Sequence, residues 1–153
     1  MANTNLIDNL NRALSLELAA VIQYQQHSFL VTGVEREIFR QYFLDQSAES
    51  RDHAITVGDK LVALGGVPTV EPGMIRQSTD FSEMLHQNLE LEREALAAYL
   101  QAWESCTDAE LPTRFQLEER IYNEQLHIDE LEKLASERKA SITTERITLR
   151  QIG

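Results

Sequence analysis

Residues 65–79, GGVPTVEPGMIRQST, form a long stretch of this 153-residue chain that lacks helical periodicity. The stretch holds two of the three prolines and three of the six glycines of the chain. Gly and Pro interrupt regular secondary structure, so their clustering predicts a connection rather than a helix or strand. A connection of this length can carry the chain from one end of a helical domain to the other, and we interpret it as a crossover.

On both sides of this connection, apolar residues recur every three or four positions, as is typical of amphipathic helices. Gly33 and Pro112 mark breaks within the two halves, and Pro112 suits the first turn of a helix. The repeat predicts four long helices, over about 4–32, 35–64, 80–105 and 112–139.

Short links within each half and a long link between the halves predict the architecture. We expect two antiparallel helical hairpins, with the crossover between the second and third helices. This all-α arrangement is the single-crossover four-helix bundle of ferritin-like folds. The tail, 141–153, is expected to form a short C-terminal helix, with a strand as the alternative, and residues 1–153 are expected to form a single domain.

Composition excludes several classes of function. The chain carries 25 acidic and 14 basic residues, a formal net charge of −11, and no Lys/Arg cluster, so no nucleic-acid partner is expected. Its apolar runs are far shorter than the ~20 residues of a membrane helix, so no membrane association is expected. Cys106 is the only cysteine, and MANTNLIDNL does not read as a secretory signal. These features predict a cytoplasmic protein.

Charged or polar side chains interrupt the apolar face of every predicted helix, although such faces normally exclude them. A single glutamate or histidine of this kind is usually a boundary or core residue. Five together would be costly to bury without cations, so we interpret them as metal ligands. The five are Glu17, His53, Glu92, Glu124 and His127.

The spacing of these residues repeats in the two halves of the chain. Glu17 and His53 are 36 residues apart, and Glu92 and His127 are 35 apart, so each hairpin presents a Glu and a His at similar separation. Glu124 and His127, at i and i+3, share one helix face. Glutamates from two helices with Glu-x-x-His pairs from two others make the di-iron centre of ferritin-like bundles. Such mixed ligands suit iron or manganese better than a closed zinc site.

At these residues the chain resembles bacterioferritin over nearly its whole length. The matching segments are LELAAVIQYQQH (16–27), DHAITVGDKLVALGGVP (52–68) and NEQLHIDELE (123–132). The resemblance to mini-ferritins, whose ligands lie across a subunit interface, is weaker. The bacterioferritin resemblance implies a 24-subunit shell that binds Fe(II) at the five residues, oxidises it with O₂ or H₂O₂, and stores Fe(III) mineral.

The resemblance also implies roles for three further residues. Tyr24 would be an aromatic residue near the site. Asp45 and Glu49 would face the inner cavity and collect iron there, with a solvated acidic face as the alternative reading.

Two departures from the bacterioferritin pattern stand in the second helix. Ser50 replaces the glutamate that would bridge the two metals, so we expect weaker or asymmetric iron occupancy. Glu49, one residue and about 100° away, should point elsewhere unless a π-bulge turns it inward. Arg51 stands where the family has its haem-ligating Met, so haem is not expected.

Three functions remain open from the sequence. The first is a ferroxidase-type iron-storage subunit of a cage. The second is a storage or nucleation subunit with an impaired site, co-assembling with a complementary bacterioferritin subunit. The third is a di-iron or di-manganese oxidase on the same bundle that forms no cage.

Overall fold

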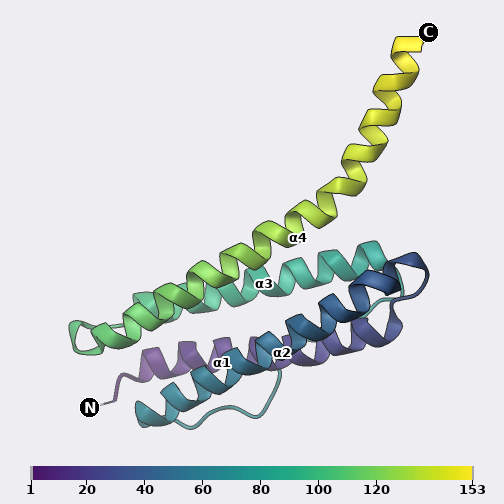
Figure 1. Cartoon of the computed structure of the whole chain (residues 1–153). Coiled ribbons are helices and arrows are strands. Elements are labelled where there is room, and N and C mark those ends of the chain that lie inside the picture. Colours follow the sequence, from purple (N-terminus) through teal and green to yellow (C-terminus); the bar gives the residue numbers. More distant parts are fainter. Residues whose placement is uncertain (1, 153) are drawn as a thin grey trace.

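The structure, a computed structural model, consists of four long helices arranged as two antiparallel pairs (Figure 1). It describes the backbone of residues 2–152 and the side chains of residues 2–135. The helices are α1 (Thr4–Leu30), α2 (Val34–Ala63), α3 (Phe81–Glu104) and α4 (Leu111–Ile152), and a 3₁₀ turn, η1 (Asp108–Glu110), precedes α4. The predicted all-α bundle with two hairpins is confirmed. None of the described helices is long and apolar enough to cross a membrane.

The helix boundaries have local causes. Asn3 Oδ1 accepts a hydrogen bond from Leu6 N at 3.1 Å, and Asp80 Oδ2 accepts one from Glu83 N at 2.8 Å, so side chains cap α1 and α3. Gly33 separates α1 from α2 with a φ of 72°, a conformation that few other residues adopt.

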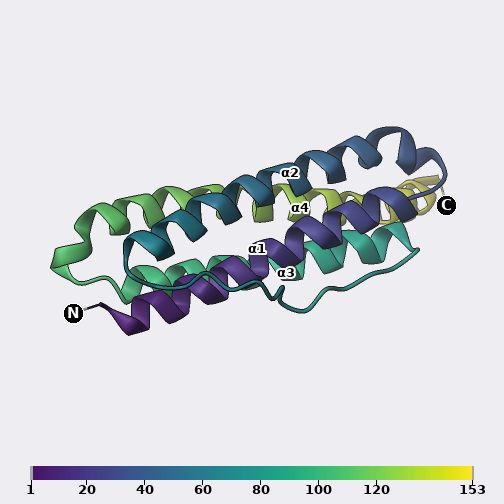
Figure 2. The ribbon, with the colours of Figure 1, turned by 90° about the horizontal axis from the view of Figure 1, so that it is seen from below.

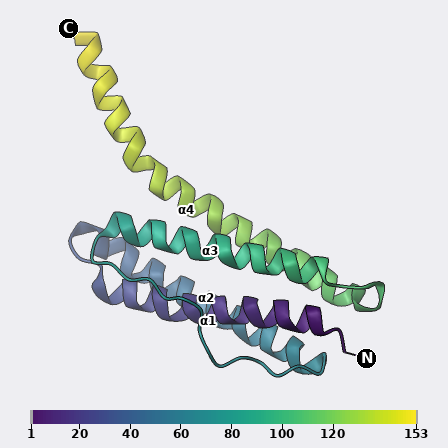
Figure 3. The same ribbon diagram turned by 180° about the vertical axis from the view of Figure 1, so that it is seen from behind.

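The predicted crossover is also confirmed, and it runs back along the bundle beside α1 (Figures 2 and 3). Gly73 N donates to Ser15 O at 2.8 Å, and Arg76 N donates to Gln23 Oε1 at 2.9 Å. These bonds satisfy backbone groups that a bare loop would leave to water. Because the crossover returns the chain to the other end of the bundle, α3 runs antiparallel to α1.

Apolar side chains from the helices fill the bundle interior. Leu6 and Leu10 of α1, Phe43 of α2 and Leu91 of α3 are all at most 1% exposed and belong to one continuous cluster. Near the α1–α2 turn, the rings of Phe39 and Phe43 approach each other with centroids 6.1 Å apart. These clusters make the bundle rigid where the polar site is embedded.

The C-terminal prediction needs a correction. The tail is helical, but it continues α4 without a break to Ile152 instead of forming a separate short helix. Between Pro112 and Gly153 the sequence contains neither Gly nor Pro, so no residue there forces the backbone out of the helix. The last part of α4 leaves the bundle (Figures 1 and 3).

Candidate metal centre

The five residues predicted as ligands come together in the bundle interior. Glu17 lies on α1, His53 on α2, Glu92 on α3, and Glu124 and His127 on α4. The three glutamates and His53 are at most 5% exposed, and the His127 side chain is 17% exposed. The structure therefore brings the five side chains into one cluster, and their role as metal ligands stays a prediction.

The donor atoms of these residues form two groups that share Glu124. One group contains Glu17, His53 and Glu124, and the other contains Glu92, Glu124 and His127, with the atoms of each group within 4.8 Å of one another. Metal–ligand bonds of ~2.0–2.3 Å place the donors of one ion at such separations. Glu124 could therefore bridge two neighbouring ions.

His53 connects three carboxylates. Its Nδ1 lies 3.2 Å from Glu17 Oε1 and 3.4 Å from Glu124 Oε1, so this nitrogen faces the centre of the site. Its Nε2 faces the other way, 3.8 Å from Glu49 Oε1. The His53 and His127 rings are stacked, with centroids 6.2 Å apart and an 11° angle between planes.

Glu49 lies closer to the site than the sequence predicts, although neither group of donor atoms includes it. Glu49 Oε1 lies 3.1 Å from His127 Nε2. The predicted 100° rotation was measured from Ser50, whereas Glu49 is four residues before His53 and thus only about 40° from it around the helix. No π-bulge is needed, because α2 is α-helical throughout Val34–Ala63. Ser50 is 5% exposed, so a buried serine stands where the bacterioferritin resemblance implies a bridging glutamate.

Glu124 is the residue that most requires a cation. It is 1% exposed, and no described residue donates a hydrogen bond to either of its carboxylate oxygens, although His53 Nδ1 lies 3.4 Å from Oε1. Burial, and then repulsion from Glu92 and Glu17, raise the pKa of Glu124 well above its ordinary value. Three buried glutamates gathered in one cluster fit a site built for divalent cations.

Two buried tyrosines hold the other glutamates. Tyr24 Oη donates to Glu92 Oε1 at 2.6 Å, and Tyr99 Oη donates to Glu17 Oε1 at 2.7 Å. Burial raises the pKa of both hydroxyls well above the ordinary range, so both stay protonated donors. This contact places Tyr24 beside the cluster, and its role as a near-site aromatic stays a prediction. Tyr99, which the sequence does not distinguish from a core aromatic, also contacts the site.

The other two flagged residues of α2 lie outside the cluster. Arg51 is exposed and pairs with Asp52 at 3.5 Å. Asp45 is exposed and accepts a hydrogen bond from Gln41 at 2.8 Å. The role of Asp45 in collecting iron on an inner surface stays a prediction.

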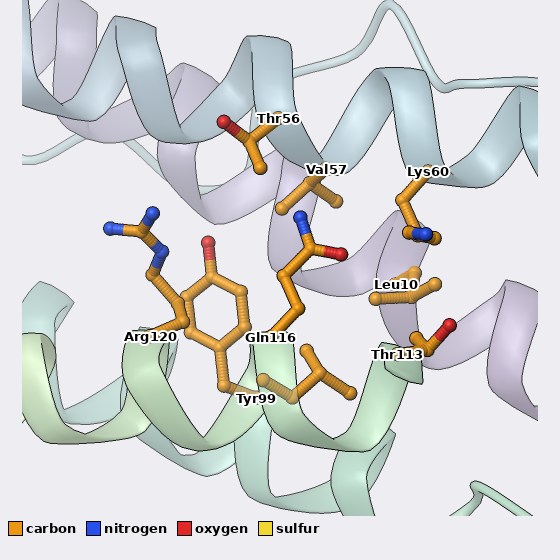
Figure 4. A pocket seen from close by; sticks show the side chains of 9 residues that line it. Leu10, Thr56, Val57, Lys60, Tyr99, Thr113, Gln116 and Arg120 are labelled. Carbon is orange, nitrogen blue, oxygen red and sulfur yellow. The ribbon is translucent and has the colours of Figure 1, made fainter. Parts of the chain in front are cut away.

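A small pocket, partly open to solvent, lies between α2 and α4 (Figure 4). Tyr99 forms part of its wall, and Lys60 and Arg120 flank it (Figure 4). These two cationic side chains would repel a divalent cation. Glu49, whose side chain is 43% exposed, instead presents a carboxylate both to solvent and to His127.

Comparison with known proteins assigns this chain to one family. The model of the ferritin-like domain matches residues 7–140, and the chain belongs to the ferritin-like family. Within that family it is a homologue of bacterioferritin. Bacterioferritin of Brucella melitensis is 31% identical over 131 residues, which cover 83% of this chain and 80% of that protein.

A second group of relatives matches over a shorter stretch. The nutrient stress-induced DNA-binding protein of Synechococcus sp. is 34% identical over 79 residues, or 52% of this chain. The match covers 45% of that protein, and 41% of the corresponding protein of Nostoc sp., so the chain spans less than half the length of these relatives.

Solved structures share the bundle. A ferritin-like diiron-carboxylate protein from Bacillus anthracis superposes with a TM-score of 0.83 at 29% identity, covering 87% of this chain and 96% of that one. A dodecameric thioferritin from Bacteroides fragilis has a TM-score of 0.83 at 24% identity, covering 94% and 92%, a likeness of fold alone.

Proposed function

We propose that this chain is an iron-storage subunit that binds Fe(II) at the five-residue cluster, oxidises it, and stores the Fe(III) product as mineral. The observation that carries the proposal is the buried carboxylate of Glu124, which accepts no hydrogen bond from the described residues and is shared by two groups of donor atoms. The bacterioferritin homologue supports the same reading.

The donor set fits two iron ions. Glu17 and His53 would hold one ion, Glu92 and His127 the other, and Glu124 would contact both. Iron bound there supplies one-electron redox chemistry that side chains lack. Two Fe(II) give two electrons, which with two protons reduce one O₂ to H₂O₂. The protein orients the carboxylates through Tyr24 and Tyr99 and keeps the site largely dry.

A second candidate function rests on Ser50. Its buried hydroxyl stands at the bridging position of the bacterioferritin pattern, so the site has one carboxylate fewer. A slow site of this kind would suit a storage or nucleation subunit that depends on a complementary bacterioferritin subunit. Ser50→Glu distinguishes the two functions, because restoring the bridge should accelerate Fe(II) oxidation if its absence is limiting.

The proposed assembly is a 24-subunit cage in the cytoplasm, with no nucleic-acid partner. Light scattering separates a shell near 24 times the 17.5 kDa subunit from a dodecamer and from a dimeric oxidase. A pull-down from native extract tests co-assembly with a second subunit type. A gel-shift titration with plasmid DNA tests the nucleic-acid expectation, which the names of the Synechococcus and Nostoc relatives make worth checking.

The central experiment adds Fe(II) anaerobically to the purified protein and then admits O₂. The proposal predicts Fe(III) formation in the wild type, and Glu124→Ala should abolish it. Glu119→Ala, which removes an exposed carboxylate on the same helix, should leave the rate unchanged. Equal rates in all three proteins would overturn the proposal.

A further inference from the structure

One carboxylate lies against the outer edges of both site histidines. Glu49 Oε1 is 3.1 Å from His127 Nε2 and 3.8 Å from His53 Nε2. The two imidazoles are stacked nearly parallel, so a single side chain can reach the same edge of each. Glu49 and His53 are four residues apart on α2, so the two side chains lie on the same face of the helix and can contact each other.

The geometry separates Glu49 from the donor groups. Neither of the two groups of atoms close enough to share an ion includes Glu49. His53 directs Nδ1 toward Glu17 and Glu124 and leaves Nε2 for Glu49. A histidine ligand usually donates its second ring N–H to a carboxylate, which fixes the tautomer and orients the ring.

The charge count points the same way. Two divalent ions carry four positive charges, while Glu17, Glu92 and Glu124 supply three negative ones. Ser50 provides none. A further carboxylate just outside the ligand atoms can offset the remaining positive charge, because the two charges would be close together and partly shielded from water.

We propose that Glu49 is a positioning residue for the metal centre, which holds both histidines with Nδ1 directed inward and supplies the negative charge that Ser50 does not. This inference rests on the proposed iron-binding function. His127 Nε2 lies 3.1 Å from Glu49 Oε1, and the tautomer with its proton on Nε2 would donate to that carboxylate and keep the Nδ1 lone pair for the ion. A proton on Nδ1 would have to leave before the metal could bind.

The test is a titration of the apoprotein with Co²⁺, followed by its visible absorption. Glu49→Gln keeps the size and an acceptor oxygen but removes the charge, and we expect its Co²⁺ affinity to fall about 10- to 100-fold. Glu49→Ala should fall at least as far. Asp52→Asn is the matched control: it removes an exposed carboxylate next to His53 and should bind within about twofold of wild type.

A second comparison isolates the charge. In a Ser50→Glu background the bridging carboxylate is restored, so Glu49→Gln should weaken Co²⁺ binding less than it does in the wild type. An equal penalty in the two backgrounds would overturn the charge role.

A crystal structure with Co²⁺, located by anomalous scattering, tests the positioning role directly. We expect His127 Nδ1 on the ion and His127 Nε2 on Glu49. Glu49 bound to the ion, or unchanged affinity in Glu49→Gln, would overturn the inference while leaving the metal centre intact. A wild type that binds no Co²⁺ would overturn the proposed function and this inference with it.

Discussion

Tyr24 on α1 donates a 2.6 Å hydrogen bond to Glu92 on α3. A second tyrosine–glutamate hydrogen bond joins the same two helices, with the donor on α3 and the acceptor on α1. Tyr99 on α3 donates to Glu17 on α1 at 2.7 Å. In each helix the tyrosine follows the glutamate by seven residues, about two helical turns. Because α1 and α3 are antiparallel, equal spacings on the two helices produce this reciprocal pairing.

The reciprocal pairing predicts matched effects of two substitutions. Tyr24→Phe and Tyr99→Phe each remove the donor to a buried carboxylate, so each should destabilise the metal-free protein by about 1–3 kcal/mol. Urea unfolding in the presence of a chelator measures the loss. Tyr122→Phe, at a 64% exposed residue of α4, should change stability little. A large loss from only one of the two buried tyrosines would contradict the pairing.

We expect the Glu124 carboxylate to lower the stability of the metal-free protein although the proposed metal binding requires it. Its folded pKa is raised, so the native state binds more protons than the unfolded state, and ionisation costs stability as pH rises above the ordinary carboxyl range. Glu124→Gln removes this cost and should stabilise the metal-free protein by about 1–3 kcal/mol at pH 8 while preventing Co²⁺ binding. Thermal unfolding with chelator checks the gain.

The matched control for that measurement is Glu119→Gln, an exposed carboxylate on α4. It should alter neither unfolding nor Co²⁺ binding. If Glu124→Gln proved less stable than wild type at pH 8, the buried carboxylate would have a stabilising partner, and the argument for a cation would weaken.

Haem content is the next prediction. Arg51 stands at the position of the family's haem-ligating methionine and is exposed on α2. Met84 is fully buried in the core, and Met74 lies in the crossover, so neither can take that place. Protein purified from haem-supplemented cells should show no Soret band. A Soret band typical of two thioether ligands would contradict the prediction.

The helices and the five-residue cluster could be predicted because the signals are local. Apolar spacing fixes which face of a helix is buried, and an acid on that face is visible without knowing its neighbours. Glu17 and Glu124 stood out for this reason. The crossover followed from Gly and Pro, whose backbone restrictions act within a few residues.

The contacts that were missed depend on angles and on neighbouring helices. Glu49 reaches the histidines because it lies only about 40° from His53 around α2. The sequence prediction measured the angle of Glu49 from Ser50 instead, and this contact was therefore missed. Tyr99 resembles an ordinary core aromatic until α3 is placed against α1. Its seven-residue spacing from Glu92, the same as that of Tyr24 from Glu17, was the available signal.

Protonation of His27 should lower the stability of the folded protein in mild acid, whether or not metal is bound. The ring is fully buried against Phe43, its Nε2 lies 3.1 Å from Gln87 Oε1, and its Nδ1 has no hydrogen-bond partner among the described residues. Burial lowers the pKa of His27 below 6.5, so the unfolded state binds its proton first. The stability contributed by neutral His27 is therefore complete above about pH 6.5 and is lost as pH falls toward the folded pKa.

The measurement is the free energy of unfolding between pH 5 and 7.5, with chelator present throughout. Wild type should lose up to about 1.4 kcal/mol per pH unit more than His27→Gln below pH 6.5, because glutamine cannot take up the proton. His86→Gln removes an exposed ring on α3 and should keep the wild-type slope, so it controls for the loss of a histidine as such. His27→Gln with an unchanged slope would show that protonation of this buried ring does not limit stability in mild acid.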